Sequence, residues 1–243
     1  MRSSTAGFGK GDQKKYSIES WRRQVSISQH ASMSLLDHCP YELVVIGTSL
    51  GGLHALEVLL AGLPESFLVP MAIAQHRHKN SEENLSGFLQ RQCALPLTEV
   101  EDKDAIAPGR IYLAPADYHL LVEAPQLKEN SPGQNGSPFC TFALSTDAPI
   151  NFARPSIDVL FESAADTYAE KAVGVILTGA SADGSQGLAK IKAHGGLAIV
   201  QEPTTAFCPM MPKAAISAVA TAKILPLDKI APFLVNICCP ALR

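Results

Sequence analysis

The sequence predicts an α/β protein with a parallel central sheet. From Tyr41 onward, short runs of β-branched and other apolar residues alternate with longer amphipathic stretches, which is the pattern of consecutive βαβ units. Apolar residues make up 47% of the 243 residues, enough to build a sizeable core. No internal repeat is present, and we expect a single domain over residues 41–243.

The first strand, turn and helix are the clearest elements. "ELVVIG" (42–47) is a continuous apolar run typical of a buried strand, and "GLHALEVLLAGL" (52–63) has the apolar spacing of a helix. "VPMAIAQ" (69–75) predicts a second strand. The stretch "SEENLSGFLQRQC" (81–93) predicts a helix capped by Ser81, whose hydroxyl can accept a hydrogen bond from a free N–H of the first turn.

The middle of the chain is expected to hold shorter strands, some of which form an antiparallel hairpin. Three short apolar runs cover residues 95–100, 109–115 and 118–124, and a fourth covers residues 139–145. The segment between the last two, "ENSPGQNGSP", is rich in turn residues. The hairpin would therefore be a small elaboration of the parallel sheet.

The second half returns to alternating helices and strands. "SIDVLFESAADTYA" (156–169) predicts a helix, "AVGVILTG" (172–179) a buried strand, and "GSQGLAKIKAHGG" (184–196) a helix ended by its glycines. The remaining elements are expected at 197–201 (strand), from about Lys213 (helix) and over Leu227–Asn236 (helix).

Composition and charge exclude several classes of protein. Twenty lysine and arginine residues against 23 acidic residues leave a formal charge of -3, so no overall field favours nucleic acid or an anionic membrane. No apolar run reaches the ~20 residues of a membrane span. The polar residues 1–40 suggest a flexible extension without the apolar core of a signal peptide. We expect a cytoplasmic protein without membrane insertion or nucleic-acid binding.

Six cysteines are present, but none forms a CxxC pair and their spacing is irregular. The pattern indicates neither a zinc site nor a disulfide framework. We expect reduced thiols, no metal and no cofactor.

The turn G47-T-S-L-G-G52 between the first strand and helix has three interpretations. A dinucleotide loop needs a second glycine where Ser49 stands, and a Walker A loop needs a lysine, so nucleotide binding is a minor alternative. Gly47 to Gly51 also matches G-x-S-x-G, in which a tight turn lifts a nucleophilic serine out of the sheet. On these five residues alone, a turn residue or helix cap is the simpler account of Ser49.

Candidate partners for Ser49 follow two other strands. A serine nucleophile needs a base, and the base needs an orienting acid. His76 follows the strand "AIAQ", and Asp183 lies in the loop after "VILTG". Because functional groups gather beyond the carboxyl ends of parallel strands, we expect all three at one edge of the sheet. His76 could instead be a solvated histidine or pair with His78 at a weak metal site, and Asp183 could be a helix cap.

Several ordered blocks together resemble one known family, the catalytic domain of chemotaxis protein-glutamate methylesterases (CheB type). Between residues 42 and about 235 they are "VVIGTSLGG", "AQH", "PGRIYLAPADYHL", "RPSIDVLFESAA", "AVGVILTGASADGSQGL" and "AIVQEPTTAFCPMMPKAAI". The resemblance implies a three-layer α/β/α sandwich. It also implies a serine hydrolase that removes methyl esters from glutamate side chains of methyl-accepting chemoreceptors and in some members deamidates glutamines.

The resemblance carries the family's nucleophile, base and acid to Ser49, His76 and Asp183. Backbone N–H groups at Leu50 and near Ala180 are then expected to bind the oxyanion. The chain departs from the family at Leu50, where a small polar residue is usual, and at Gly179-Ala180-Ser181, where Gly-Met-Gly is usual. Usual members also carry a receiver domain of about 120 residues, which about 40 polar residues cannot replace. A separate response regulator acting in trans is therefore a candidate partner.

Two further substrate-site candidates come from these blocks. Arg154 could contact an acidic receptor helix or form a structural ion pair. Met211, beside Met210 in a proline-framed loop, could line the cleft or fill the core. For the whole chain, the alternatives to a receptor methylesterase are a weakly catalytic receptor-binding or scaffold module and an esterase of small molecules.

Overall fold

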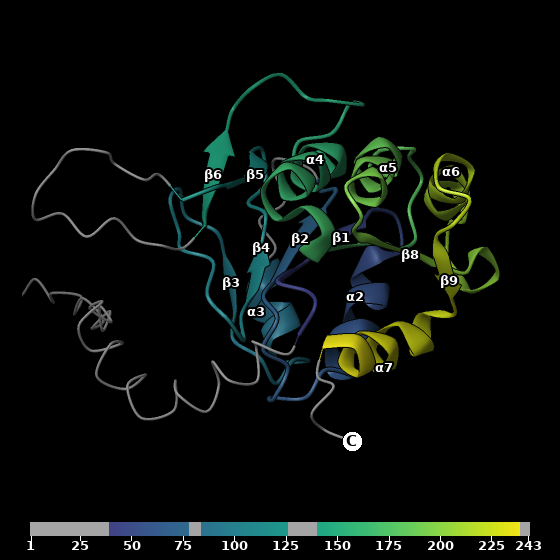
Figure 1. The fold of residues 1–243 in the computed structure, drawn as a ribbon, viewed down its shortest axis with the longest axis horizontal. Helices are drawn as coiled ribbons and strands as arrows, with labels where there is room; N and C mark the ends of the chain where they lie inside the picture. The colour runs from purple at the N-terminus through teal and green to yellow at the C-terminus, as the bar shows by residue number, and fades with distance from the viewer. Residues whose placement is uncertain (1–38, 78–83, 126–139, 239–243) are drawn as a thin grey trace, which may run out of the picture. The chain divides into compact units, whose positions relative to one another are not determined.

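A seven-stranded sheet forms the centre of the computed structural model, which describes residues 39–77, 84–125 and 140–238 (Figure 1). The strand order is β3-β4-β2-β1-β7-β8-β9, and each neighbouring pair is parallel. The strands are β1 (Leu43–Thr48), β2 (Met71–Gln75), β3 (Leu97–Glu99), β4 (Ile111–Leu113), β7 (Ala172–Ile176), β8 (Leu197–Gln201) and β9 (Lys223–Leu225). The predicted parallel sheet is thus confirmed.

Helices cover both faces of this sheet (Figure 1). One face carries α4 (Ile157–Tyr168), α5 (Ser185–Ala193) and α6 (Met210–Ala218), and the other carries α2 (Gly52–Ala61), α3 (Leu85–Gln90) and α7 (Leu227–Cys238). Successive side chains of a strand point to opposite faces, so in β1 Val45 joins the core under α4 to α6, and Val44 joins the core under α2 and α7. The three-layer α/β/α sandwich is confirmed.

A separate two-stranded antiparallel sheet holds β5 (His119–Glu123) and β6 (Thr141–Ser145), with β5 lying against α4. This sheet confirms the predicted hairpin elaboration, and the turn-rich segment expected between its strands lies outside the described residues. The other short strands of the middle region, β3 and β4, belong instead to the parallel sheet.

Some element boundaries were predicted wrongly. Helix α3 begins at Leu85 and its cap is Asn84, whose side chain accepts a hydrogen bond from the Gly87 N–H; Ser81 lies outside the described residues. Helix α6 begins at Met210 rather than near Lys213, because a proline is tolerated in the first turn, where N–H groups have no helical partner.

Strand β9 was not predicted. It has three residues, lies at the edge of the sheet and exposes two of its side chains, so it lacks the apolar run of a buried strand. The extension predicted over residues 1–40 lies outside the described residues except for Cys39 and Pro40. No described helix combines the length and apolar character needed to cross a membrane.

Candidate active site

The carboxyl ends of three neighbouring strands bring together Ser49, His76 and Asp183. Ser49 follows β1, His76 follows β2, and Asp183 lies in the loop between β7 and α5. Two backbone hydrogen bonds hold these ends together, from the His76 N–H to the Thr48 carbonyl (3.0 Å) and from the Ser49 N–H to the Thr178 carbonyl (3.0 Å). The expected meeting of the three residues at one sheet edge is therefore what the structure shows.

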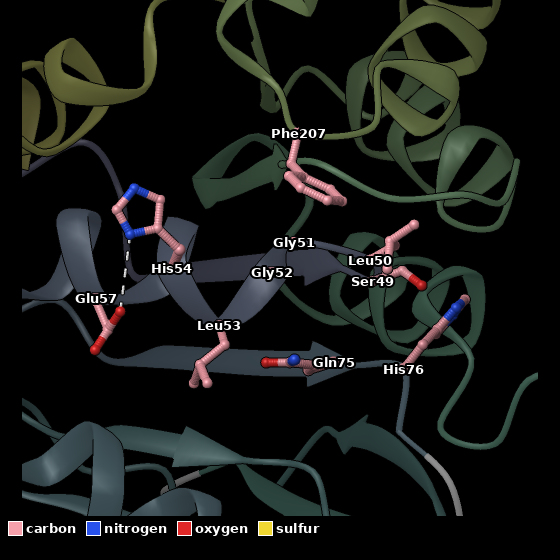
Figure 2. Close-up of a pocket in the computed structure, with 10 residues that line it drawn as sticks. All are labelled: Ser49, Leu50, Gly51, Gly52, Leu53, His54, Glu57, Gln75, His76 and Phe207. Atoms are coloured by element: carbon pink, nitrogen blue, oxygen red, sulfur yellow. Dashed lines mark ion pairs between the residues drawn. The ribbon is translucent and has the colours of Figure 1, made fainter.

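The turn that carries Ser49 depends on its second glycine. Gly51 has a φ of 80°, which L side chains rarely adopt, and a Cβ atom there would lie 2.5 Å from the Cβ of Phe207. Gly51 is also the N-cap of α2, and no side chain caps this helix. Ser49 is thus not a helix cap, and its side chain is left to face the pocket (Figure 2).

His76 and Asp183 form a directly bonded pair. The distance between His76 Nε2 and Asp183 Oδ2 is 2.7 Å, and the carboxylate side chain is fully buried while the imidazole is 15% exposed. Because a carboxylate only accepts, Nε2 carries the proton and Nδ1 keeps a free lone pair. Figure 2 shows the Ser49 hydroxyl pointing toward this imidazole. The hydroxyl has no hydrogen-bond partner among the described residues, a common state in enzymes without substrate.

Asp183 is held as an anion by the N-terminus of α4. Oδ2 accepts from the Ile157 N–H (2.6 Å), and Oδ1 accepts from the Ser156 hydroxyl (2.8 Å) and the Asp158 N–H (3.2 Å). Burial alone would raise the pKa of Asp183, but the hydrogen bonds from His76, Ile157 and Ser156 hold it below its usual range. The carboxylate is thus charged at neutral pH and fixes the orientation of His76.

An open pocket of about 600 Å³ lies beside Ser49 and His76 (Figure 2). Its lining is Ser49, Leu50, Gly51, Gly52, Leu53, His54, Glu57, Gln75, His76 and Phe207. Leu50 is 52% and Phe207 76% exposed, so two large apolar side chains flank the serine. The Oε1 atom of Gln75 is buried and has no hydrogen-bond partner among the described residues. The pocket therefore offers a substrate apolar walls beside Ser49 and His76.

Two backbone N–H groups near Ser49 are available to an oxyanion. Within the described part of the chain, no acceptor is bonded to the N–H of Leu50 or of Ala180. The carbonyls of the same two peptide groups are bonded: that of Ser49 accepts from the Gly52 N–H (2.8 Å), and that of Gly179 accepts from the Met211 N–H (2.9 Å). Free N–H groups held in place in this way are the donors that an oxyanion hole requires.

Gly179 keeps space open between Ser49 and α6. A Cβ atom there would lie 2.6 Å from Met211 Cε and 2.9 Å from Ser49 Cβ, distances that force something to shift. The position of the Ser49 Cβ is set by the backbone, so this atom cannot move away without moving the whole residue. We therefore expect Gly179→Ala to displace Ser49 and lower kcat by about 10- to 100-fold. Steady-state kinetics of the wild type and the variant would measure this.

Gly174→Ala, in the same strand–loop segment, is the matched control. A Cβ at Gly174 would lie 2.7 Å from Leu188 Cδ1 and 2.8 Å from Ile191 Cδ1, two side chains of α5 that do not line the pocket. This variant should lose stability by about 1–3 kcal/mol through overpacking but keep kcat in the folded protein. Equal loss of kcat in both variants would show that Gly179 has no specific role beside Ser49.

The structure assigns other contacts to the remaining candidates. The guanidinium of Arg154 donates to Asp117 (2.6 Å) and to the carbonyls of Thr146 (2.7 Å) and Asp147 (2.9 Å), so the structural ion pair is the interaction observed. Met211 is buried against Gly179, with its N–H bonded to the Gly179 carbonyl (2.9 Å). Neither side chain lines the pocket.

Several residues at the site were missed by sequence reasoning. Gln75 immediately precedes His76, so the same strand-end argument could have found it. His54 lines the pocket from the first turn of α2. The contacts of Asn151 and Asp158 with Asp183 depend on how two helices pack, which no local pattern in the sequence reports. His78, of the alternative metal pair, lies outside the described residues.

Comparison with known proteins places these features in a family. The family model described as CheB methylesterase matches residues 44–234. A homologue from Leptospira interrogans, provisionally named protein-glutamate methylesterase/protein-glutamine glutaminase, is 43% identical over 197 residues, which cover 81% of this chain and 95% of the homologue.

Two further similarities come from Thermotoga maritima. Its protein-glutamate methylesterase/protein-glutamine glutaminase is 35% identical over 189 residues, and this chain spans only 52% of its length. The crystal structure of the T. maritima CheB methylesterase catalytic domain superposes with a TM-score of 0.73 at 33% identity and covers 81% of this chain and 98% of that domain. The chain therefore belongs to the CheB methylesterase family.

Proposed function

We propose that this protein hydrolyses γ-methyl esters of glutamate side chains on chemoreceptors, and that it also deamidates receptor glutamines. The proposal is supported by the family, by the names of the homologues and by one central observation. That observation is the 2.7 Å contact of His76 with buried Asp183 at the strand end next to Ser49. Methyl-accepting chemoreceptors are the partner class that this activity requires, and the cytoplasm is the compartment in which we propose that it acts.

The proposed reaction begins at the Ser49 hydroxyl. The free Nδ1 of His76 takes the hydroxyl proton as Oγ attacks the ester carbonyl, and the imidazolium then gives that proton to the departing methanol. Water, activated by His76, hydrolyses the acyl-enzyme and releases glutamate. Asp183 keeps the proton on Nε2 throughout and stabilises the imidazolium.

The charge that develops on the carbonyl oxygen would be stabilised by the backbone. The N–H groups of Leu50 and Ala180 lack acceptors in the described structure, and Leu50 directly precedes the glycine turn at the start of α2. The positive end of this helix dipole favours negative charge at the same place. A glutamine substrate would follow the same course with ammonia as the leaving group.

The test compares three reactions of the full chain. Methanol release from a methylated receptor fragment, hydrolysis of a small ester such as p-nitrophenyl acetate, and labelling of Ser49 by a fluorophosphonate probe would be measured together. We expect labelling of the folded but not the heat-unfolded protein, and a strong preference for the receptor fragment. Labelling with preference for the small ester would indicate a small-molecule esterase, and absence of labelling would indicate a binding or scaffold module.

Gln75 provides a separate prediction about stability. Replacing it with methionine removes the buried, unpartnered Oε1 at nearly constant size, so we expect stability to rise by about 1 kcal/mol. Because this oxygen has almost no exposed surface, a substrate does not reach it, and kcat and KM should stay close to the wild-type values. Thermal unfolding and steady-state kinetics would measure both effects.

Gln201→Met is the matched control for the stability effect. Gln201 is fully buried, but its Oε1 accepts from the Thr178 N–H (2.8 Å) and its Nε2 donates to the Thr205 carbonyl (2.9 Å). We therefore expect this variant to lose about 1–3 kcal/mol. A loss of similar size in Gln75→Met would show that its oxygen is satisfied in solution.

A further inference from the structure

Two carboxylates, Asp158 and Asp183, lie at the N-termini of each other's helices. Asp183, just before α5, accepts N–H bonds from Ile157 and Asp158 in the first turn of α4. Asp158, in that first turn, accepts from the N–H of Gly187 (2.8 Å) in the first turn of α5. Each carboxylate thus occupies a favourable position at a helix dipole, and the two helices are clamped together at the active site.

Asn151 joins these two carboxylates directly. Its Nδ2 atom lies 3.2 Å from Asp158 Oδ2 and 3.4 Å from Asp183 Oδ1, so one amide group donates to both. Asn151 has a φ of 50°, and the next residue, Phe152, has a φ of 63°, which is uncommon for residues other than glycine. The strained backbone of these two residues places the Asn151 amide between the negatively charged carboxylates of Asp158 and Asp183.

Keeping the Asp158 carboxylate ionised in the folded protein is energetically unfavourable. The residue is 6% exposed, and within the described residues no lysine or arginine forms an ion pair with it. Burial raises the pKa of Asp158 from 3.8 to about 6; the Gly187 N–H opposes the rise and the charge of Asp183 adds to it. Below about pH 4 the protonated Asp158 is fully compatible with its buried site, and this stability is lost as the pH rises from about 4, where the residue ionises in the unfolded chain, through about 6, where it ionises in the folded protein. A purely structural contact would be served better by a neutral residue.

We propose that Asp158 is a positioning residue of the active site, which fixes Asp183 through Asn151 and α5 and adds a second negative charge that strengthens His76 as a base. The inference rests on the proposed function and deepens it. No hydrogen bond or ion pair joins Asp158 to His76 in the described structure; Asp158 holds Asp183 in place and affects His76 through its charge. Two anions behind the imidazole stabilise its protonated form, which is the form created when Ser49 is deprotonated.

The other ionisable groups near Asp158 are either exposed to water or bonded to partners of their own. Glu162 lies one turn further along α4 and is exposed, where water screens its charge. On α5, Lys190 is paired with Asp166 (2.7 Å). From β5, His119 accepts the Ser156 N–H through Nδ1 (3.2 Å) and lies near the Ala148 carbonyl through Nε2 (3.2 Å), which fits a neutral ring. The carboxylate of Asp183 remains the main charge that faces Asp158.

The experiment measures the rate of Ser49 labelling by a fluorophosphonate probe from pH 5 to pH 9. Asp158→Asn keeps an acceptor for the Gly187 N–H. In this variant we expect the acidic limb of the profile of labelling rate against pH to move to lower pH by about 0.5–1 unit, because the imidazolium of His76 has lost part of the negative charge that stabilises it. The plateau rate should fall by about 3- to 10-fold because the base is weaker. Asp158→Asn should also lose the decline in thermal stability that the raised pKa of Asp158 predicts for the wild type between about pH 4 and pH 6.

A second variant shifts the profile the other way. Asn151→Gly suits the backbone at φ 50° and removes the amide that donates to both carboxylates, so less of their negative charge is dispersed and the acidic limb of its pH–rate profile should move to higher pH. This variant leaves both carboxylates and the helix contacts in place. If Asp158→Asn does not fold, the profile of Asn151→Gly therefore decides the question. Glu162→Gln, which removes one charge from the exposed side of the same helix, should follow the wild type.

Three results would overturn the inference. They are an Asp158→Asn profile that superposes on the wild type, an equal shift in Glu162→Gln, or, where Asp158→Asn does not fold, an unshifted Asn151→Gly profile. A wild-type protein that is not labelled would instead overturn the proposed function itself. Labelling of the wild type with an unshifted variant leaves the proposed function intact, so the two failures are distinguishable.

Discussion

Ser49→Ala is expected to lower methanol release from a methylated receptor fragment by about 10⁴-fold or more. The reason is that no other hydroxyl lies in the pocket: among its described lining residues, Ser49 alone carries a side-chain hydroxyl. The backbone N–H groups of Leu50 and Ala180 do not depend on this side chain, so residual hydrolysis above the rate in water should remain. Methanol quantified over a time course would give both rates.

The matched control for this variant is Ser217→Ala. Ser217 is exposed on α6, and its hydroxyl bonds only to the Lys213 carbonyl (2.9 Å), so the same substitution there should leave activity unchanged. Fluorophosphonate labelling should disappear in Ser49→Ala and persist in Ser217→Ala. Methanol release by Ser49→Ala at the wild-type rate would exclude the assigned nucleophile.

Asp183→Asn is expected to lower kcat by about 10³- to 10⁴-fold with a small change in KM. The carboxylate accepts from His76, Ile157 and Ser156, and an asparagine would present an N–H₂ group to one of these donors. If that group faces His76, the imidazole must accept at Nε2 and carry its proton on Nδ1, the nitrogen that Ser49 needs as a base. The variant would fold, but its His76 imidazole would carry the proton on Nδ1 instead of Nε2.

The pH dependence of stability gives an independent check on Asp183. Its pKa is lowered in the folded protein, so the carboxylate contributes stability at neutral pH that is lost as the pH falls below about 4. The difference in unfolding temperature between wild type and Asp183→Asn should therefore be largest near pH 7 and shrink in acid. A constant difference across this range would contradict the view that Asp183 is a stabilised anion.

The sequence was sufficient to predict the parallel sheet and the positions of three site residues. The runs that became β1 and β7 are apolar throughout because both faces of these strands are buried, and such runs are recognisable without a structure. Since parallel strands end at one edge, Ser49, His76 and Asp183 could be expected to meet there. Their catalytic roles stay predictions.

Contacts that depend on packing between distant elements could not be predicted. Arg154 meets Asp117 across 37 positions of sequence, and no periodic pattern indicates which of two possible partners a guanidinium finds. Met210 and Met211 are chemically identical neighbours, yet one is 55% exposed and the other 1% exposed, because the phase of α6 decides which side faces Gly179. Asp158 looks like an ordinary acidic residue of a first helical turn.

The position of β1 between β2 and β7 also has a consequence for how activity is lost. The three strand ends that carry the candidate triad belong to adjacent strands at the middle of the sheet, joined by long parallel ladders and covered by helices on both faces. Fraying of the edge strands β3 or β9 leaves these ladders intact, whereas separating the central strands disrupts both cores. Enzymatic activity should accordingly survive local opening at the sheet margins and disappear together with the cooperative unfolding of the domain.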